Sequence, residues 1–570
     1  WENVLTTTTG CGRKRPPTEQ QRRAADPDRS VWVTANAGTG KTRVLTDRIL
    51  RLLLAGADPE GILAITFTKA AAAEMTQRIE RRLTDWATFE DGALAADLEA
   101  LLGRPAREAE RTLARTLLAR ILDLPRGLSI ATIHAFCQTL LRRFPIEAGV
   151  PPHFEAIDER DAAELQREAA AQVLAAADRD VDRLGRAVGN LALWLADSSI
   201  EDLLGEVVAA RTRLQRARAA RGDLDGLLAA VARALRAEPG LPPRQIVERA
   251  CADGVFDAER LARAAEVLRE GGQRDGERAS RIAAWIQAVP ADRVRLFDDY
   301  RRAFVGSNGA ALQERSLMSK ALADRHPDLL RTLVREQARI LEADDTVRRQ
   351  MLYAKTEAML VFAFAILDRY EELEKHRAAL DFDDLIDHAR RLLAGSGQRD
   401  WVLFRLDARI DHILIDEAQD TSPAQWEIVE RLTEEFFTGE GARGTSRTLF
   451  VVGDEKQSIY RFQGADLANF RAVRERLRKA AEAARRPIET ALLDRSFRSV
   501  PAILELVDAV FDDPETRAGV TDGPLHHGSE RAGEAGIVEL WPLAQPVAGA
   551  ALAEPWALPD APTRAVEGEQ

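Results

Sequence analysis

The sequence predicts an α/β protein in which a parallel sheet is interrupted by a large all-helical insertion. Two short apolar runs, Ser30–Ala35 and Ile62–Thr68, are each followed by a segment with helical periodicity, and this βαβα order is typical of a parallel sheet. Residues 151–370 are rich in Ala, Leu, Arg and Glu and poor in β-branched runs, which favours helices. Sheet-like runs return at His412–Ile415 and Thr448–Val452, so we expect the sheet to be completed after the insertion.

Periodicity and helix-stop residues predict the remaining elements. Gly56 is placed to end a helix over Thr42–Ala55. The sequence also predicts a helix over Lys69–Leu83, a strand over Leu128–Ile133, a helix over Val500–Phe511 and a strand over Val538–Leu543, after which the chain is rich in Ala and Pro.

Composition excludes several classes of protein but leaves the function open. The length of 570 residues suits about two to four domains, and a net charge of −12 argues against a protein that simply coats nucleic acid. No run approaches the roughly 18 uncharged apolar residues needed to span a membrane, and the N-terminus lacks a secretory pattern. Cys11, Cys137 and Cys251 form no disulfide or metal pattern, so we expect a cytoplasmic protein without a membrane partner.

The segment Ala35–Thr42 (ANAGTGKT) has the composition of a loop that cradles phosphate groups. Gly38 and Gly40 allow backbone dihedrals that point successive N–H groups at phosphate oxygens, and the following helix offers its positive dipole end. Lys41 is expected to reach the terminal phosphates and Thr42 to ligate Mg²⁺. The alternative is a glycine-rich turn with a surface lysine. The residues expected to bind the nucleotide here are Ala35, Asn36, Ala37, Gly38, Thr39, Gly40, Lys41 and Thr42.

A nucleotide site also needs carboxylates at the end of a neighbouring strand, and the segment HILIDEAQD at 412–420 has them. Asp416 is expected to hold Mg²⁺, and Glu417 to orient and deprotonate the attacking water. The alternative is that both residues cap a helix that begins near Pro423. Because Lys41 and Asp416 are 375 residues apart, the helical segment between them is expected to loop out of the nucleotide-binding domain.

Several segments stand in the order of a known set of motifs. They are Gln21–Ala24, Ala35–Thr42, Ile65–Met75, Thr132–Phe136, Asp416–Gln419, Val451–Asp466 and Asp494–Ser499. Together they resemble superfamily 1 DNA helicases of the UvrD/Rep type. Longer strings such as WVTANAGTGKT, ITFTKAAAAEM and SIATIHAFCQTLLRRFP resemble AddA more closely. AddA is the helicase–nuclease subunit of bacterial AddAB complexes, here in its alphaproteobacterial form, with RecB and UvrD as near alternatives.

The resemblance implies roles for further residues. Gln21 would read adenine, Gln457 would sense the γ-phosphate, and Arg498 would be a cationic finger from a second motor domain. Phe67, Tyr460 and Phe462 fall where the family stacks DNA bases, and core packing is the alternative for each of them. Thr132 and His134 lie in a DNA-contacting motif, and a structural histidine is the alternative for His134. Gln463 stands where many relatives have Arg, so one contact of the family is in doubt.

The function implied is that of an ATP-dependent 3′-to-5′ DNA helicase or translocase subunit in double-strand break repair. The implied cofactors are ATP and Mg²⁺, and the implied partners are single- or double-stranded DNA ends and an AddB-type subunit in a heterodimer. Motifs V and VI and the nuclease domain are not found, so we expect the N-terminal part of a longer protein. The alternatives are a UvrD/Rep-like repair helicase and a truncated, non-catalytic homologue that binds DNA or a partner.

The resemblance and the composition together predict a RecA-like motor domain with a helical insertion and the beginning of a second motor domain. The expected divisions are a disordered segment at 1–17, the first motor domain at 18–150 and 371–490, the helical insertion at 151–370, the start of the second motor domain at 491–544 and a Pro/Ala-rich tail or linker at 545–570.

Two charged segments could suggest further sites. The carboxylates of Leu380–Leu385 (LDFDDL) precede a helix, so we interpret them as a helix cap and a solvated face, not as a nuclease. The arginines of 211–221 alternate with Ala and Leu, which is typical of a solvated helix face first and of a DNA contact second.

Overall fold

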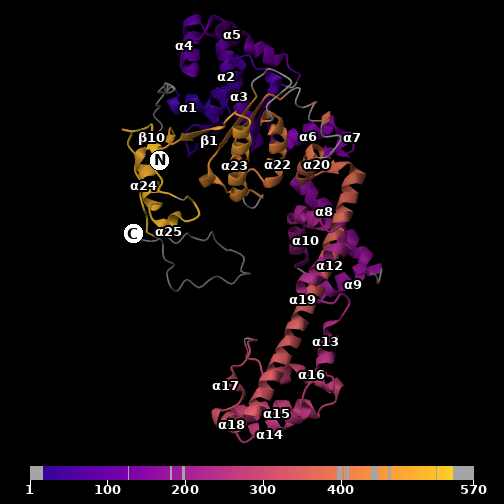
Figure 1. Cartoon of the computed structure of the whole chain (residues 1–570). Helices are drawn as coiled ribbons and strands as arrows, with labels where there is room; N and C mark the ends of the chain where they lie inside the picture. The colour runs from indigo at the N-terminus through magenta and orange to yellow at the C-terminus, as the bar shows by residue number, and fades with distance from the viewer. Residues whose placement is uncertain are drawn as a thin grey trace, which may run out of the picture. The chain divides into compact units, whose positions relative to one another are not determined.

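A computed structural model describes residues 17–125, 127–179, 183–194, 199–307, 309–394, 401–402, 405, 410–437, 447–459, 464–521 and 523–542. The chain divides into two compact units (Figure 1). Unit 1 contains the described parts of Trp1–Ala156 and Leu380–Gln570, and unit 2 is the continuous segment Ile157–Ala379. Unit 2 contains most of the helical insertion expected at 151–370, but residues 371–379, expected in the motor domain, belong to unit 2 because the long helix α19 (Pro327–Arg377) continues into them.

Unit 1 is built on a six-stranded sheet in the order β3-β2-β6-β7-β1-β8, and every adjacent pair of strands is parallel. The strands are β1 (Val31–Ala35), β2 (Ile62–Thr66), β3 (Ser129–Thr132), β6 (His412–Ile415), β7 (Thr448–Gly453) and β8 (Glu489–Leu493). β6 and β7 lie between β2 and β1, so the segment after the insertion completes the sheet, as predicted. Because all strands are parallel, their carboxyl ends meet at one edge.

Alternate residues of the strands face two separate hydrophobic layers, as expected of a sheet covered on both sides. In β1, Trp32 packs in one layer while Val31 and Val33 pack in the other. The first layer contains residues of α6 (Ile133–Arg143), α20 (Phe382–Ala394), α22 (Pro423–Thr433) and α23 (Leu467–Ala483). The second contains residues of α2 (Lys41–Leu54), α3 (Lys69–Thr88), α4 (Asp91–Leu102) and α5 (Glu108–Leu122). The shorter helices of unit 1 are α1 (Glu19–Ala24), α7 (Pro145–Ala148), α24 (Pro501–Val510) and α25 (Pro514–Arg517).

The C-terminal part of unit 1 differs from the prediction in two places. β8 lies at the edge of the sheet beside β1, and the boundary expected between residues 490 and 491 falls inside this strand. The prediction of a strand at Val538–Leu543 is wrong, because residues 538–542 form no strand and the side chains of Leu540 and Trp541 are exposed. The predicted helix is present as α24, and the short strands β9 (Arg495–Ser496) and β10 (Gly528–Ser529) pair with each other.

Unit 2 is helical, and its longest helix, α19, runs through it (Figure 1). One core surrounds Trp285, Tyr300 and Phe304, and smaller cores form where α19 packs on α8, α9 and α12. The helices are α8 (Glu159–Arg179), α9 (Arg183–Ala192), α10 (Ser199–Ala209), α11 (Arg211–Ala219), α12 (Leu224–Leu235), α13 (Pro243–Ala250), α14 (Ala258–Leu268), α15 (Gln273–Gln287), α16 (Pro290–Arg301), α17 (Glu314–Leu317), α18 (Lys320–Arg325) and α19 (Pro327–Arg377). The two-residue strands β4 (Glu155–Ala156) and β5 (Ala379–Leu380) lie where the chain passes between the units.

α19 is also the one helix, among the described residues, that is long and apolar enough by length and composition to cross a membrane. Half of its most apolar window is buried inside the protein, and residues between 358 and 367 of this helix pack in cores of unit 2. This is weak evidence for a membrane span, because core helices of soluble proteins pass the same test.

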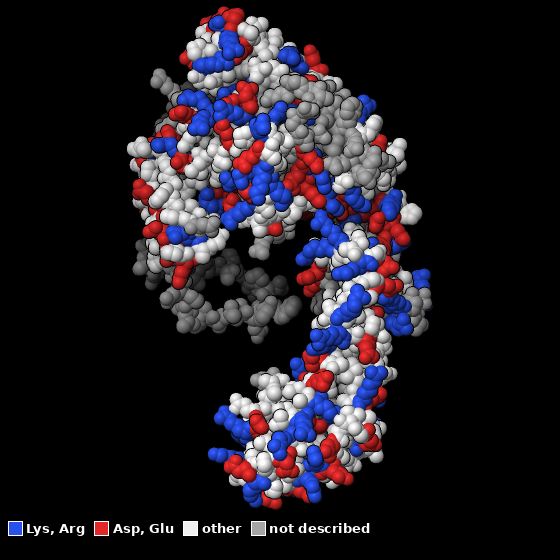
Figure 2. Space-filling model, in the orientation of Figure 1, with Lys and Arg blue, Asp and Glu red and all other residues white. Residues whose placement is uncertain are grey.

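The arginines of 211–221 are partly used inside unit 2. Arg211 is buried, pairs with Glu374 at 3.4 Å and lies over the ring of Tyr370. Arg218 donates two hydrogen bonds to Asp368, at 2.7 and 2.9 Å. Elsewhere in the unit, around α14–α18, basic and acidic side chains are intermixed on the surface (Figure 2). The arginine run is thus partly structural.

Candidate functional site

The predicted phosphate loop connects β1 to α2 at the carboxyl edge of the sheet. Gly38 has φ +74° and Gly40 has φ +85°, a left-handed conformation that residues with a Cβ rarely adopt. Thr39 is buried and donates its hydroxyl to the carbonyl of Asn36 at 2.8 Å, which closes the loop. α2 begins at Lys41 with no side-chain cap, so its first-turn N–H groups and its dipole are available to an anion.

The remaining loop residues hold or extend this loop. Ala35 is the last residue of β1, and the N–H of Asn36 donates to the carbonyl of Leu493 at 3.1 Å, so β8 also anchors the loop. Ala37 is exposed, and Thr42 lies in the first turn of α2. The structure therefore places the eight predicted residues in one strand–loop–helix segment.

Lys41 lies between two side chains from other strands. Its Nζ is 2.8 Å from Glu417 Oε2 and 3.2 Å from Gln457 Oε1. Glu417 follows β6, and Gln457 follows β7. Three residues that are far apart in the sequence thus meet at the same edge of the sheet, as their motifs predict.

The acidic pair follows β6 directly. Burial, and next the negative charge of Glu417, raises the pKa of Asp416 to about 6. Glu417 has φ +47°, a left-handed conformation that costs a residue with a side chain about 1 kcal/mol or more and is typical of functional sites. The cap of α22 is Ser422, whose Oγ accepts from the N–H of Gln425. The alternative that Asp416 and Glu417 cap this helix is therefore wrong.

Gln21 is bonded to the phosphate loop. Its Nε2 donates to the carbonyl of Thr39 at 2.9 Å, and its Oε1 accepts from the N–H of Thr18 at 3.0 Å. The side chain is buried and also closes the capping box of α1. One N–H of its amide thus supports the phosphate loop.

Arg498 belongs to a segment that packs directly on the loop. The N–H of Phe497 donates to the carbonyl of Gly38 at 2.8 Å. A Cβ at Gly38 would lie 2.7 Å from Arg498 Cβ and from Ser496 Oγ, so this packing also requires glycine. The Arg498 side chain is exposed, and its guanidinium has no hydrogen-bond partner among the described residues.

Three of the residues predicted to contact DNA lie at or just after the carboxyl ends of β2 and β3, at the same edge of the sheet. Phe67 is half-buried, and the hydroxyl of Thr132 caps α6 by accepting from the N–H of Ala135 at 3.2 Å. His134 packs on Phe382 with ring centroids 5.2 Å apart, and burial lowers the pKa of the imidazole. Tyr460 and Phe462 lie outside the described residues.

The comparison with known families agrees with this geometry. Residues 17–478 match the model of the UvrD/REP helicase N-terminal domain. The chain belongs to this family.

Curated relatives of this UvrD/REP-type chain are named as a subunit of an ATP-dependent helicase/nuclease. The protein of Natranaerobius thermophilus is 27% identical over 542 residues, which is 87% of this chain and 37% of the relative. The protein of Desulfitobacterium hafniense (strain DSM 10664 / DCB-2) is 27% identical over 87% of this chain and 36% of the relative. The protein of Pelotomaculum thermopropionicum is 28% identical over 88% of this chain and 38% of the relative. The chain thus spans little more than a third of the length of these relatives.

The UvrD/REP-type site includes a cavity of about 770 Å³ that sequence reasoning missed. Gly40, Arg43 and Phe497 line its end next to the phosphate loop, since Arg43 Cβ and Phe497 Cδ2 lie within 4.0 Å of where a Gly40 Cβ would be. A guanidinium and an aromatic ring beside a phosphate loop suit a planar base. Arg43 directly follows the phosphate loop, so its position in the sequence could have indicated a residue that lies beside the bound nucleotide.

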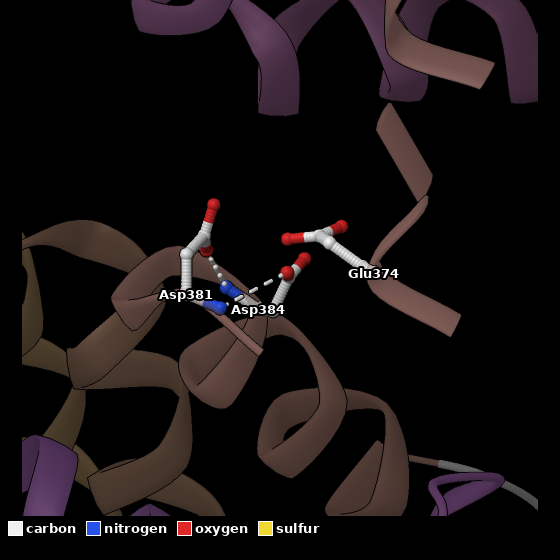
Figure 3. A group of neighbouring side chains, drawn as sticks. All are labelled: Glu374, Asp381 and Asp384. Atoms are coloured by element: carbon white, nitrogen blue, oxygen red, sulfur yellow. Dashed lines mark hydrogen bonds between the residues drawn. The ribbon is translucent and has the colours of Figure 1, made fainter. Parts of the chain in front are cut away.

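The acidic segment 380–385 contains a helix cap, as interpreted from the sequence (Figure 3). The solvated face expected there is wrong for Asp381 and Asp384, which are buried, and only Asp383 is exposed. The N–H of Asp384 donates to Asp381 Oδ1 at 2.8 Å, and the N–H of Asp381 lies 3.4 Å from Asp384 Oδ2. Glu374, also labelled in Figure 3, belongs to unit 2 and pairs there with Arg211. These carboxylates are used in capping and in an ion pair.

Proposed function

We propose that this chain is the ATP-hydrolysing first motor domain of an AddA-type DNA helicase. The observation that carries the proposal is the meeting of Lys41, Glu417 and Gln457 at the carboxyl edge of the parallel sheet, with Asp416 beside them. In this proposal the loop binds the phosphates and Lys41 neutralises the terminal ones. Glu417 accepts the proton of the attacking water while the bond between the γ-phosphorus and the bridging oxygen breaks.

The residues present fit Mg²⁺. Asp416 and Thr42 supply a carboxylate and a hydroxyl oxygen, which are ligands that this hard cation takes. The carboxylate of Asp416 is buried and its pKa is raised, so a divalent cation would offset the desolvation that raises it. The ion, when bound, would neutralise charge on the β- and γ-phosphate oxygens.

The cavity beside Gly40 is the proposed adenine site. Phe497 offers a ring on which the base can stack and Arg43 a planar cation, while the remaining N–H of Gln21 can donate to a ring nitrogen. Arg498 follows Phe497, and it is the proposed cationic finger that stabilises transition-state charge.

The proposed DNA path lies along the carboxyl ends of β2 and β3, at Phe67, Thr132 and His134. From the resemblance of the sequence motifs to AddA, we also propose action on DNA ends in double-strand break repair, the 3′-to-5′ direction, an AddB-type partner and a cytoplasmic location. The relatives themselves are named only as a subunit of an ATP-dependent helicase/nuclease. The UvrD/REP family membership and the complete set of Lys41, Asp416 and Glu417 favour catalysis over a non-catalytic homologue.

The test is ATP turnover by the intact protein with and without single-stranded DNA. Lys41→Ala should abolish the stimulated turnover, because it removes the ammonium group that bonds to both Glu417 and Gln457 and is proposed to neutralise the terminal phosphates. Lys479→Ala, which removes an exposed lysine of α23, is the control and should leave turnover unchanged. Undiminished turnover in Lys41→Ala would show that hydrolysis occurs elsewhere.

A further inference from the structure

Gln419, just after the acidic pair, has a side chain that is fully committed to hydrogen bonds. Its Nε2 donates to Glu417 Oε2 at 2.8 Å and to Asp420 Oδ2 at 2.9 Å. Its Oε1 accepts from the N–H of Asp454 at 2.9 Å. Only 1% of Gln419 is exposed, so water has little access to its amide.

The bonds of Gln419 close a ring through the candidate site. Asp454 accepts from Gln457 Nε2 at 2.7 Å, and Gln457 Oε1 accepts from Lys41 Nζ at 3.2 Å. Lys41 in turn donates to Glu417 Oε2, the oxygen that Gln419 also holds. The end of β6 and the end of β7 are therefore joined at two places, by Lys41 on one side and by Gln419 on the other.

Gly453, the last residue of β7, is explained by the same side chain. A Cβ at this position would lie 2.8 Å from Gln419 Oε1 and 3.3 Å from the Gln419 nitrogen. Its φ is outside the left-handed region, so the backbone conformation does not demand glycine. The glycine is needed because the amide of Gln419 occupies the space where a side chain would be.

We infer that Gln419 is a positioning residue that holds the Glu417 carboxylate in place and fixes the end of β7 against it. Glu417 stands in a strained left-handed conformation, so its direction depends on the groups that hold its carboxylate. Lys41 is one of these groups, and the proposed function engages it with phosphate. Gln419 is then the donor that keeps the carboxylate oriented throughout turnover. The inference rests on the proposed function, in which Glu417 is the base.

The test compares Gln419→Met with Gln350→Met in the intact protein. Gln350 is a matched control in unit 2, because it is 3% exposed and makes three hydrogen bonds to residues 238 and 241. We expect Gln419→Met to lower kcat for ATP by roughly 10- to 100-fold with KM changed less than about threefold, because misplacing a catalytic group costs rate more than binding. Gln350→Met should keep wild-type kcat. An unchanged kcat in Gln419→Met, a loss confined to KM, or an equal loss of kcat in Gln350→Met would overturn the inference.

A double-mutant cycle keeps the inference testable if Gln419→Met folds poorly. Gly453→Ala should lower kcat in the wild-type background, because the new methyl group displaces the amide. In Gln419→Ala the same change should cost little, because the obstructed amide is gone. Strictly additive effects would contradict the inference. If the wild-type protein lacks ATP turnover, or if Lys41→Ala retains it, the proposed function fails. If Lys41→Ala is inactive but Gln419→Met has a normal kcat, only the role of Gln419 is refuted.

Discussion

Arg48 offers the sharpest test of how unit 1 is held together. Arg48 is fully buried and lies on α2, the helix that follows the phosphate loop. Its guanidinium donates to the backbone carbonyls of Ala24, Asp26 and Arg29 and to Thr448 Oγ1. These bonds tie the segment between α1 and β1 to the sheet. Burial lowers the pKa of the guanidinium to about 9.

The magnitude follows from two opposing terms. Removing the guanidinium leaves four acceptors without their donor, which costs about 1–3 kcal/mol for each one that water cannot reach. Burial opposes this because it penalises the charge, and it is the largest cause of the lowering of the Arg48 pKa to about 9. Arg48→Met should therefore lower the free energy of unfolding of unit 1 by about 3 kcal/mol.

The assay is urea unfolding followed by far-ultraviolet circular dichroism, with Arg120→Met, an exposed arginine of α5, as the control. The control should change stability by less than about 0.5 kcal/mol. If Arg48→Met proved as stable as wild type or more stable, desolvation would outweigh the hydrogen bonds, as it does for some buried ion pairs, and our reasoning would be refuted.

Two further predictions concern pH and the nucleotide base. Burial, with a smaller contribution from Arg48, lowers the pKa of His412 to about 4, so the stability it contributes is full above pH 6.5 and is lost as pH falls from 6.5 to 4. Between pH 6.5 and pH 4, the free energy of unfolding of the wild type should fall by up to about 3 kcal/mol more than that of His412→Gln. Parallel pH profiles of the two proteins would contradict this. Phe497→Ala should raise KM for ATP roughly 10-fold with little change in kcat, because stacking on a base is worth about 1–3 kcal/mol. The control is Leu506→Ala, which changes an exposed residue of α24 and should leave KM for ATP unchanged. Equal kinetics in both variants would exclude Phe497 from the base site.

The sequence predicted those parts of the fold and site that depend on local pattern. Apolar runs that end in glycine or in an acidic pair are strands that deliver side chains to a parallel edge, so Lys41 and Asp416 could be assigned to one edge of the sheet across the insertion. β8 was missed because ETALL is an edge strand with alternating exposure and no β-branched run. Arg48 and Gln419 were missed because their partners come from other segments, and only the folded chain shows that an arginine or glutamine is enclosed.

Some side chains carry a structural role that the motif alone does not reveal. Thr132 caps α6, and Gln21 braces the phosphate loop, although both stand in segments predicted to meet a ligand. A hydroxyl or amide has several hydrogen-bonding positions, so a motif residue can support the fold and still offer a position to DNA or nucleotide. Their ligand contacts stay predictions.

The central claim is that one site binds ATP and hydrolyses it with Glu417 as the base. Glu417→Gln keeps the size of the side chain and an oxygen that can accept from Lys41 and Gln419, but it cannot take a proton from water. The deciding measurement is ATP turnover together with the Kd for Mg·ATP in this variant. We expect turnover to fall by a factor on the order of 10² to 10⁴ while Kd changes less than about threefold. Turnover at the wild-type rate, or loss of binding together with turnover, would contradict the claim.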